Sequence, residues 1–250
     1  MHCFYCVHLS PHREQLIIDD PDEVHHLARV LRVRPGDEVE LVNGRGVWGR
    51  ARCLKIAKQT VEVVLLQCQE TPVFNSVRTV LACALPKRAR FDDIIEKCTE
   101  LGVDEIVPLI TERTEAAPNQ EALLRMAARF NKVVLSASKQ CKRLWFPVVY
   151  SPMLFSQAVD VFAIDGNALY FPWLAGERKL LKDAMGQSSD KILKARVFFI
   201  GPEGDFTAAE AAYAVGKGAV PVSLGATVLR VETAAIAVAA YAHFITGGSS

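Results

Sequence analysis

From residue 80 onward, short apolar segments alternate with segments of helical spacing, and this alternation constrains the fold more than any other feature. Five apolar segments have the length of buried strands: residues 80–85, 106–110, 159–165, 196–200 and 220–224. Apolar residues recur every three or four positions in the intervening segments, at residues 91–101, 119–140, 207–216 and 231–246. Strands that alternate with helices usually pair in parallel. The sequence therefore predicts an α/β domain with a mainly parallel sheet.

The first 70 residues have a different pattern, in which short strands are separated by turns that contain Gly and Asn. Residues 39–42 and 60–65 are strand-like, and residues 21–30 favour one short helix. Several strands around one helix predict a small barrel-like domain. We expect the barrel to occupy residues 1–72 and the α/β domain to occupy residues 73–250.

Composition places the chain among globular proteins. Half of its 250 residues are hydrophobic and 23% are charged, so a sizeable core is expected and wholesale disorder is excluded. No apolar run approaches the roughly 20 residues that cross a bilayer, and the first residues do not resemble a secretion signal. We expect a cytoplasmic protein with no membrane partner. Cys3 and Cys6 form a Cys-x-x-Cys pair without a second pair, which favours reduced thiols and no metal site.

The charge distribution favours an anionic partner more than the formal net charge of +1 suggests. Residues 25–58 contain eight Lys or Arg and three acids, and residues 125–143 contain six Lys or Arg and no acid. A near-neutral total is compatible with a basic face, because association responds to the local field.

Two strand-to-helix loops are the segments suited to chemistry. In the first, an apolar strand ends in Gly201-Pro202-Glu203-Gly204, and Thr207 with Glu210 has the spacing of a capping box for the next helix. Glycines allow a ligand to approach the backbone at the carboxyl end of a strand, which is where open α/β sheets bind ligands. An ordinary tight turn is the alternative.

The second loop, residues 224–230, leads into a helix rich in Ala, Ile and Val, which we expect in the core or in a subunit interface. Arg230 and Glu232 stand beside this helix, and they either serve a ligand or form a structural ion pair. The chain lacks the phosphate-loop, dinucleotide, HExxH and GxSxG motifs, so the common nucleotide-binding and hydrolase classes are disfavoured.

In combination, these loops resemble those of the RsmE family of bacterial ribosomal RNA uridine-N3 methyltransferases, which belongs to the SPOUT class. Further matching segments follow in order along nearly the whole chain: residues 25–37, Leu85-Pro86-Lys87 with Phe91, residues 97–103, and residues 108–113. The resemblance implies an N-terminal PUA-like β-barrel and a C-terminal α/β domain with a trefoil knot. It also implies S-adenosylmethionine (SAM) as cofactor, a homodimer, and methylation of a uridine in 16S ribosomal RNA of the small subunit.

The resemblance, together with the chemistry of the implied reaction, assigns residues to three roles. The cofactor is expected against Ile164, Asp165, Ile200, Gly201, Glu203, Gly204, Leu224, Gly225, Val228, Leu229 and Arg230. Catalysis is expected to use Arg230 beside a uracil carbonyl, with Glu203 or Glu232 accepting the N3 proton. RNA contact is expected from Arg29, Arg32, Lys87, Arg88, Arg90 and Arg113, for which a solvated charged face is the alternative.

Three positions depart from the family pattern. Asp205 stands where a second Gly is favoured, Val231 where Thr is favoured, and Lys139 where Glu is usual. Asp205 precedes a helix amino end, which tolerates an acid, so loss of activity does not follow. Two other functions stay open: a ribosome-assembly factor that binds RNA without methylating it, and a methyltransferase that acts on another RNA site.

Overall fold

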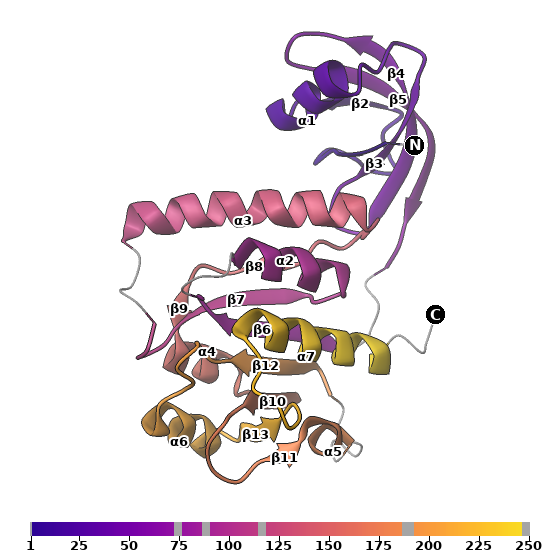
Figure 1. Cartoon of the computed structure of the whole chain (residues 1–250). Helices are drawn as coiled ribbons and strands as arrows, with labels where there is room; N and C mark the ends of the chain where they lie inside the picture. The colour runs from indigo at the N-terminus through magenta and orange to yellow at the C-terminus, as the bar shows by residue number, and fades with distance from the viewer. Residues whose placement is uncertain (1, 73–76, 87–90, 115–118, 187–192, 247–250) are drawn as a thin grey trace. The chain divides into compact units, whose positions relative to one another are not determined.

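The computed structural model describes residues 2–72, 77–86, 91–114, 119–186 and 193–246 (Figure 1). The chain forms two compact units. The first contains Met1–Asn75 together with Leu135–Phe146, and the second contains Ser76–Val134 and Pro147–Ser250. The short segment Leu135–Phe146 is far from the rest of the first unit in sequence, and sequence patterns did not predict its place there.

The first unit is built on a five-stranded sheet with the order β1-β3-β4-β5-β2. Its strands are β1 (Cys3–Tyr5), β2 (Gln15–Ile18), β3 (Glu38–Val42), β4 (Val47–Ile56) and β5 (Val61–Glu70). β1 pairs with β3 in parallel and the other pairs are antiparallel. The strands predicted at residues 39–42 and 60–65 are confirmed as parts of β3 and β5.

The side chains of this sheet alternate between a core and solvent, as expected for a sheet with one buried face. In β4, Ala51 and Cys53 are buried whereas Arg50 and Arg52 are exposed. The predicted helix over residues 21–30 is confirmed as α1 (Pro21–His25) followed by a π-helical turn, η1 (His26–Val30). Asp20 caps α1 by accepting a hydrogen bond from the Glu23 amide at 3.0 Å. Val24 and Leu27 join the core.

The segment Leu135–Phe146 is attached to the first unit by backbone and side-chain contacts. The amide of Gly46 donates to the Leu144 carbonyl at 3.0 Å, and the amide of Phe146 donates to the Gly44 carbonyl at 3.0 Å. Gly44 and Gly46 have positive φ angles of 70° and 87°, and a Cβ at either would lie within 2.6 Å of the segment's aromatic side chains or of neighbouring backbone. The turn therefore requires glycine at both positions.

The second unit is built on a sheet whose eight described strands are all parallel, which confirms the predicted mainly parallel pairing. The main order is β11-β13-β10-β12-β6-β7-β8, and β9 pairs with β7. The strands are β6 (Arg78–Ala84), β7 (Glu105–Ile110), β8 (Val148–Val149), β9 (Met153–Leu154), β10 (Asn167–Pro172), β11 (Lys179–Leu180), β12 (Ala195–Ile200) and β13 (Val220–Ser223).

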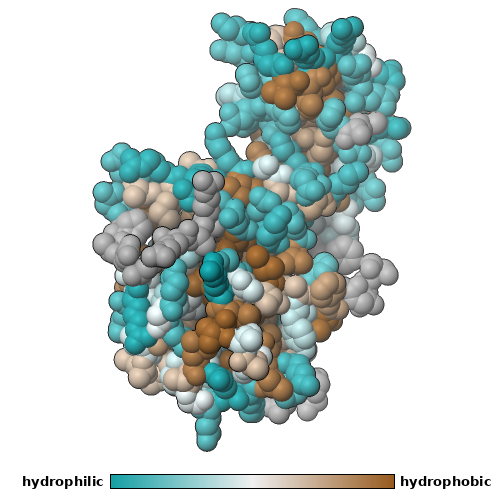
Figure 2. Space-filling view, viewed as in Figure 1, coloured by the Kyte–Doolittle hydropathy of each residue, from teal (hydrophilic) through white to brown (hydrophobic). Residues whose placement is uncertain are grey.

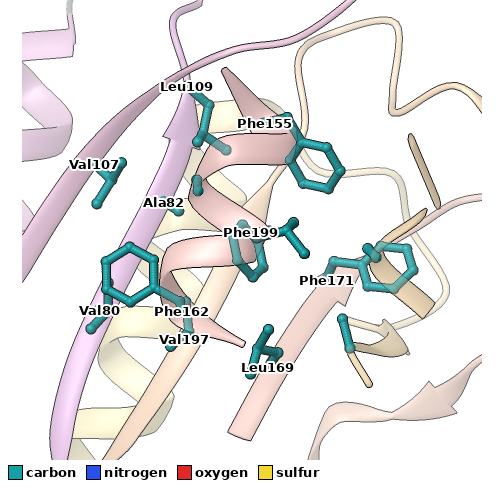
Figure 3. Packing of buried hydrophobic residues seen from close by; sticks show 14 of the residues in the cluster. Val80, Ala82, Val107, Leu109, Phe155, Phe162, Leu169, Phe171, Val197 and Phe199 are labelled. Atoms are coloured by element: carbon teal, nitrogen blue, oxygen red, sulfur yellow. The ribbon is translucent and has the colours of Figure 1, made fainter. Parts of the chain in front are cut away.

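Helices pack on both faces of this sheet (Figure 1). They are α2 (Phe91–Glu100), α4 (Phe155–Phe162), α5 (Leu181–Gly186), α6 (Ala208–Gly216) and α7 (Val231–Thr246). The long helix α3 (Gln120–Gln140), whose last six residues belong to the first unit, contacts α2 through the rings of Phe130 and Phe91. α2 and α7 pack against each other, and α4 packs against α6. Figure 3 shows the core beneath α4, where Phe155 and Phe162 lie over Val80, Val107 and Phe199. None of the helices in the described residues has the length and apolar character needed to cross a membrane.

The strand predicted at residues 159–165 is wrong. These residues begin in α4, in which Phe155, Ala158, Val159 and Phe162 are buried at helical spacing, and the strand β10 follows at Asn167–Pro172. A short apolar run fits a buried strand and a buried helix face equally well by periodicity, so only its surroundings decide between them.

Candidate active site

A pocket of about 300 Å³ lies at the carboxyl ends of β10, β12 and β13. It is lined by residues 172–174, 178, 200–203, 205, 222–231 and 234. Both loops that the sequence marked for chemistry therefore contribute to one cavity, at the edge where parallel sheets bind ligands. Eight of the residues expected at the cofactor line it: Ile200, Gly201, Glu203, Leu224, Gly225, Val228, Leu229 and Arg230.

The first loop is fixed by the cap of α6. The predicted capping box is confirmed: the Glu210 amide donates to Thr207 Oγ1 at 3.2 Å, and the Thr207 amide donates to Glu210 Oε2 at 2.9 Å. The other carboxylate oxygen of Glu210 accepts a hydrogen bond from the Glu112 amide at 3.0 Å. Glu210 is buried, so a single carboxylate joins the start of α6 to the loop after β7.

That connection places Arg113 against the first loop. Arg113 Nη1 donates to the Gly204 carbonyl and lies 3.5 Å from the Asp205 carbonyl. Gly204 itself does not line the pocket, and a Cβ there would lie 3.2 Å from the Arg113 side chain. Arg113 was expected to contact RNA, and the structure shows it in contact with the backbone of the first loop.

The second loop combines a glycine with a positive φ angle and several exposed side chains. Gly225 has φ of 132°, and its amide and carbonyl both lie within hydrogen-bonding distance of Ser223 Oγ. Val228 is 74% exposed, and Arg230 is exposed at the start of α7. Among the described residues, Arg230 and Glu232 form no ion pair within 4 Å, so the structural pair considered as an alternative is not observed.

Besides the two loops, the pocket has a third wall, and this wall is not the segment at Ile164 and Asp165 that the sequence predicted. Ile164 and Asp165 precede β10 and line a separate pocket of about 550 Å³ at its amino end. Trp173, Leu174 and Arg178 line the first pocket instead, because the strand lies later in the sequence than predicted. Arg178 donates to the Trp173 carbonyl at 2.8 Å and also to the Leu174 carbonyl. The sequence signal was the apolar segment Leu169–Phe171, which precedes these residues and forms half of the strand.

Cysteine chemistry at this site is disfavoured by burial. Cys83 lies on β6 and is fully buried, and burial with the nearby carboxylates of Glu203 and Glu232 raises its pKa well above the ordinary value. Burial also raises the pKa of Cys98 to about 12. Both groups are therefore neutral thiols near pH 7. All seven cysteines are free, and the described residues contain no cluster of three metal-binding side chains.

The remaining residues expected at RNA are divided between the two units. Arg29 and Arg32 are exposed on the first unit, where Arg32 has φ of 53° just after η1. Lys87, Arg88 and Arg90 lie outside the described residues.

Comparisons with known proteins agree with this architecture. Residues 74–243 match a family model described as an RNA methyltransferase domain, and residues 18–66 match one described as an RNA methyltransferase PUA domain. A Synechocystis protein named ribosomal RNA small subunit methyltransferase E is 34% identical over 85% of this chain and 67% of its own length. The protein of the same name from Mycobacterium tuberculosis is 33% identical over 93% of this chain and 87% of its own length.

Two solved structures are similar over the full length. A ribosomal RNA small subunit methyltransferase E from Neisseria gonorrhoeae, bound to S-adenosyl methionine, has a TM-score of 0.86 and 28% identity, with 98% of each chain covered. A methyltransferase from Legionella pneumophila, in complex with SAM, has a TM-score of 0.85 and 27% identity, with 97% of each chain covered. With its PUA-type unit followed by an α/β unit of the SPOUT class, the chain belongs to the ribosomal RNA small subunit methyltransferase E family.

Proposed function

We propose that this protein transfers the methyl group of SAM to N3 of a uridine in 16S ribosomal RNA. The observation that carries the proposal is the single pocket formed by the two loops, at the carboxyl edge of a parallel sheet. Relatives over nearly the whole chain are named small-subunit ribosomal RNA methyltransferases, and two similar structures contain SAM.

The lining of the pocket fits this cofactor. Leu224, Val228 and Leu229 offer apolar surface to an adenosyl group, and a Cβ at Gly225 would enter open space beside the pocket. Arg178 offers positive charge to a carboxylate. When bound, SAM supplies a methyl group made electrophilic by its sulfonium.

The chain's own residues must make uracil N3 nucleophilic, because N3 carries a proton in the neutral base. Arg230 lines the pocket without an ion-pair partner among the described residues, so it can stabilise negative charge on a uracil carbonyl. Glu203 also lines the pocket and is the better placed proton acceptor, whereas Glu232 is half-buried and does not line it.

RNA contact is assigned to exposed arginines of the first unit and to a segment of the second. Arg29 and Arg32 follow α1 and are free to reach phosphates. Lys87, Arg88 and Arg90, which belong to the second unit and lie outside the described residues, are proposed as further RNA contacts. The target uridine has to leave its base stack before N3 can enter a pocket of this kind.

The proposal includes a homodimer. Figure 2 shows hydrophobic side chains exposed on the face of the second unit where Figure 1 shows α7. Along this helix Ile236, Ala240 and Phe244 recur every four residues, and they are half-buried or exposed. A stripe of this kind on a helix suits contact with a second copy of the chain.

The trefoil knot implied by the resemblance stays a prediction.

The deciding experiment is mass spectrometry of ribosomal RNA from a strain that lacks the gene. Loss of N3-methyluridine from 16S RNA, restored by the wild-type gene, is the expected result. Loss of a different mark would indicate another RNA site. An unchanged set of modifications would favour the assembly factor without catalysis.

A further inference from the structure

Asp205 occupies a backbone conformation that L residues rarely adopt. Its φ of 62° lies in the left-handed region, which explains why glycine suits this position. Asp and Asn tolerate the conformation when their short polar side chains bond locally. The carboxylate of Asp205 makes such local bonds and one longer-range bond.

The two carboxylate oxygens of Asp205 accept hydrogen bonds from different segments. Oδ1 accepts from the Phe206 amide at 2.8 Å, within the same loop. Oδ2 accepts from the Leu174 amide at 2.9 Å, which is 31 residues away in the loop after β10. Both Asp205 and Leu174 line the pocket, so this second bond joins two of its walls. Glycine at this position has no group that could make the bond.

The residues before and after Asp205 are fixed by hydrogen bonds that do not involve its carboxylate. Arg113 donates to the Gly204 carbonyl, and the capping box with Glu210 fixes the residues that follow. The loop after β10 is held at Trp173, whose amide donates to the Val222 carbonyl at 3.2 Å. Its next residue, Leu174, is 53% exposed, and Arg178 donates to the Trp173 and Leu174 carbonyls of the same loop. Removal of the Asp205 carboxylate should therefore release the pocket wall that contains Leu174, here called the Leu174 wall, and leave the fold intact.

We propose that Asp205 is a positioning residue that sets the spacing between the Leu174 wall and the first loop, and thereby the affinity for SAM. The proposal rests on the proposed function, because SAM is the ligand of that reaction. The carboxylate acts through Leu174 and is not assigned a direct contact with the ligand. The family pattern does not supply this tether, since it favours glycine at the position.

The test compares the full chain with Asp205→Gly, Asp205→Asn and a matched control, Asp104→Asn. Asp104 accepts the Thr79 amide at 2.8 Å at the amino edge of the same sheet, so its loss tests a similar bond far from the pocket. Binding of SAM and of its demethylated product is measured by calorimetry. Steady-state assays with ribosomal RNA give kcat and the KM of each substrate, and thermal unfolding monitors the fold.

Asp205→Gly should weaken SAM binding about tenfold, the equivalent of one ordinary hydrogen bond. The KM for SAM should rise by a similar factor, with kcat and the KM for RNA changed less than about threefold. Asp205→Asn should lie between wild type and Asp205→Gly, because one amide oxygen can still accept one bond. Asp104→Asn should leave SAM affinity unchanged.

Wild-type affinity in Asp205→Gly would overturn the inference while leaving the proposed function intact. Equal losses in Asp205→Asn and Asp205→Gly would also overturn it, because they would indicate that charge at the ligand matters and the tether does not. A fall in kcat at constant KM and affinity would overturn it too, because the carboxylate would then contribute to the transition state and not to SAM binding. Absence of SAM binding in the wild type would overturn the proposed function and the inference together.

Discussion

At the scale of the residue, Arg230 is the side chain on which the proposed chemistry depends. It lines the pocket, is exposed, and has no ion-pair partner among the described residues. Arg230→Ala should reduce methyl transfer by at least about a hundredfold, as expected for loss of a charge-stabilising group, and should leave the Kd for SAM within a few-fold. Single-turnover assays and calorimetry measure the two effects. Wild-type turnover in the variant would contradict the assignment.

The buried thiols give a prediction about alkaline stability. Burial raises the pKa of Cys98 from its ordinary value of 9.0 to about 12. Above pH 9 the unfolded chain releases this proton and the folded chain keeps it, so the free energy of unfolding falls as pH rises toward 12. In urea titrations, Cys98→Ala should reduce this decline by up to about 1.4 kcal/mol per pH unit. Parallel curves for variant and wild type would show that the thiol does not contribute.

At the scale of the element, the end of α3 is tied to the first unit by a buried ion pair. Lys139 Nζ donates to Glu23 Oε1, with the side chains 15% and 3% exposed, and Glu23 Oε2 accepts the Tyr5 amide at 3.0 Å. Lys139 departs from the family pattern, and its contact with Glu23 gives the departure a structural reason.

Removing one partner of this pair should cost more than removing both. Lys139→Ala leaves the Glu23 carboxylate buried without its cation, and should lower the free energy of unfolding by about 3 kcal/mol. The double variant Lys139→Met with Glu23→Gln should recover most of that loss. Denaturant unfolding of the two proteins measures the difference, with Lys142→Ala as the exposed control. Equal destabilisation by the single and double variants would show that the ionic contact is unimportant.

Elements also show where sequence reasoning reached its limit. The long periodic helices α3 and α7 and the capped helix α6 were predicted closely, because their spacing and caps are local properties. The helix α4 was predicted as a strand, and this error moved the third wall of the pocket from Trp173 and Leu174 to Ile164 and Asp165.

At the scale of the whole molecule, the proposed homodimer can be tested through α7. Phe244 is 75% exposed at one end of the apolar stripe. Phe244→Asp would place a charge in an apolar contact, so the dimer should dissociate at least about tenfold more readily. Sedimentation equilibrium measures this change, and Val161→Asp on α4, which is 55% exposed, is the control. A monomeric wild type, or an unaffected dimer in the variant, would contradict the proposed interface.

RNA binding tests the proposed basic surface. Arg32→Glu should weaken binding to ribosomal RNA and flatten the dependence of log affinity on log salt, because fewer counterions are released. Arg13→Glu, an exposed arginine of the same unit outside the proposed surface, should have a smaller effect. Filter binding over a series of salt concentrations measures both. An unchanged slope in Arg32→Glu would remove this arginine from the surface.

The sequence alone determined the order of most elements, the α/β character of the second unit and the two ligand loops, because helix periods, caps and glycine turns are encoded locally. Only the tertiary structure decided what those residues contact. It brought Leu174 to Asp205, Arg113 to Gly204 and Lys139 to Glu23, each pair separated by more than 30 residues. Such pairings depend on how β-strands order themselves in a sheet and on which buried charge needs a partner. Neither property leaves a periodic signal in the chain.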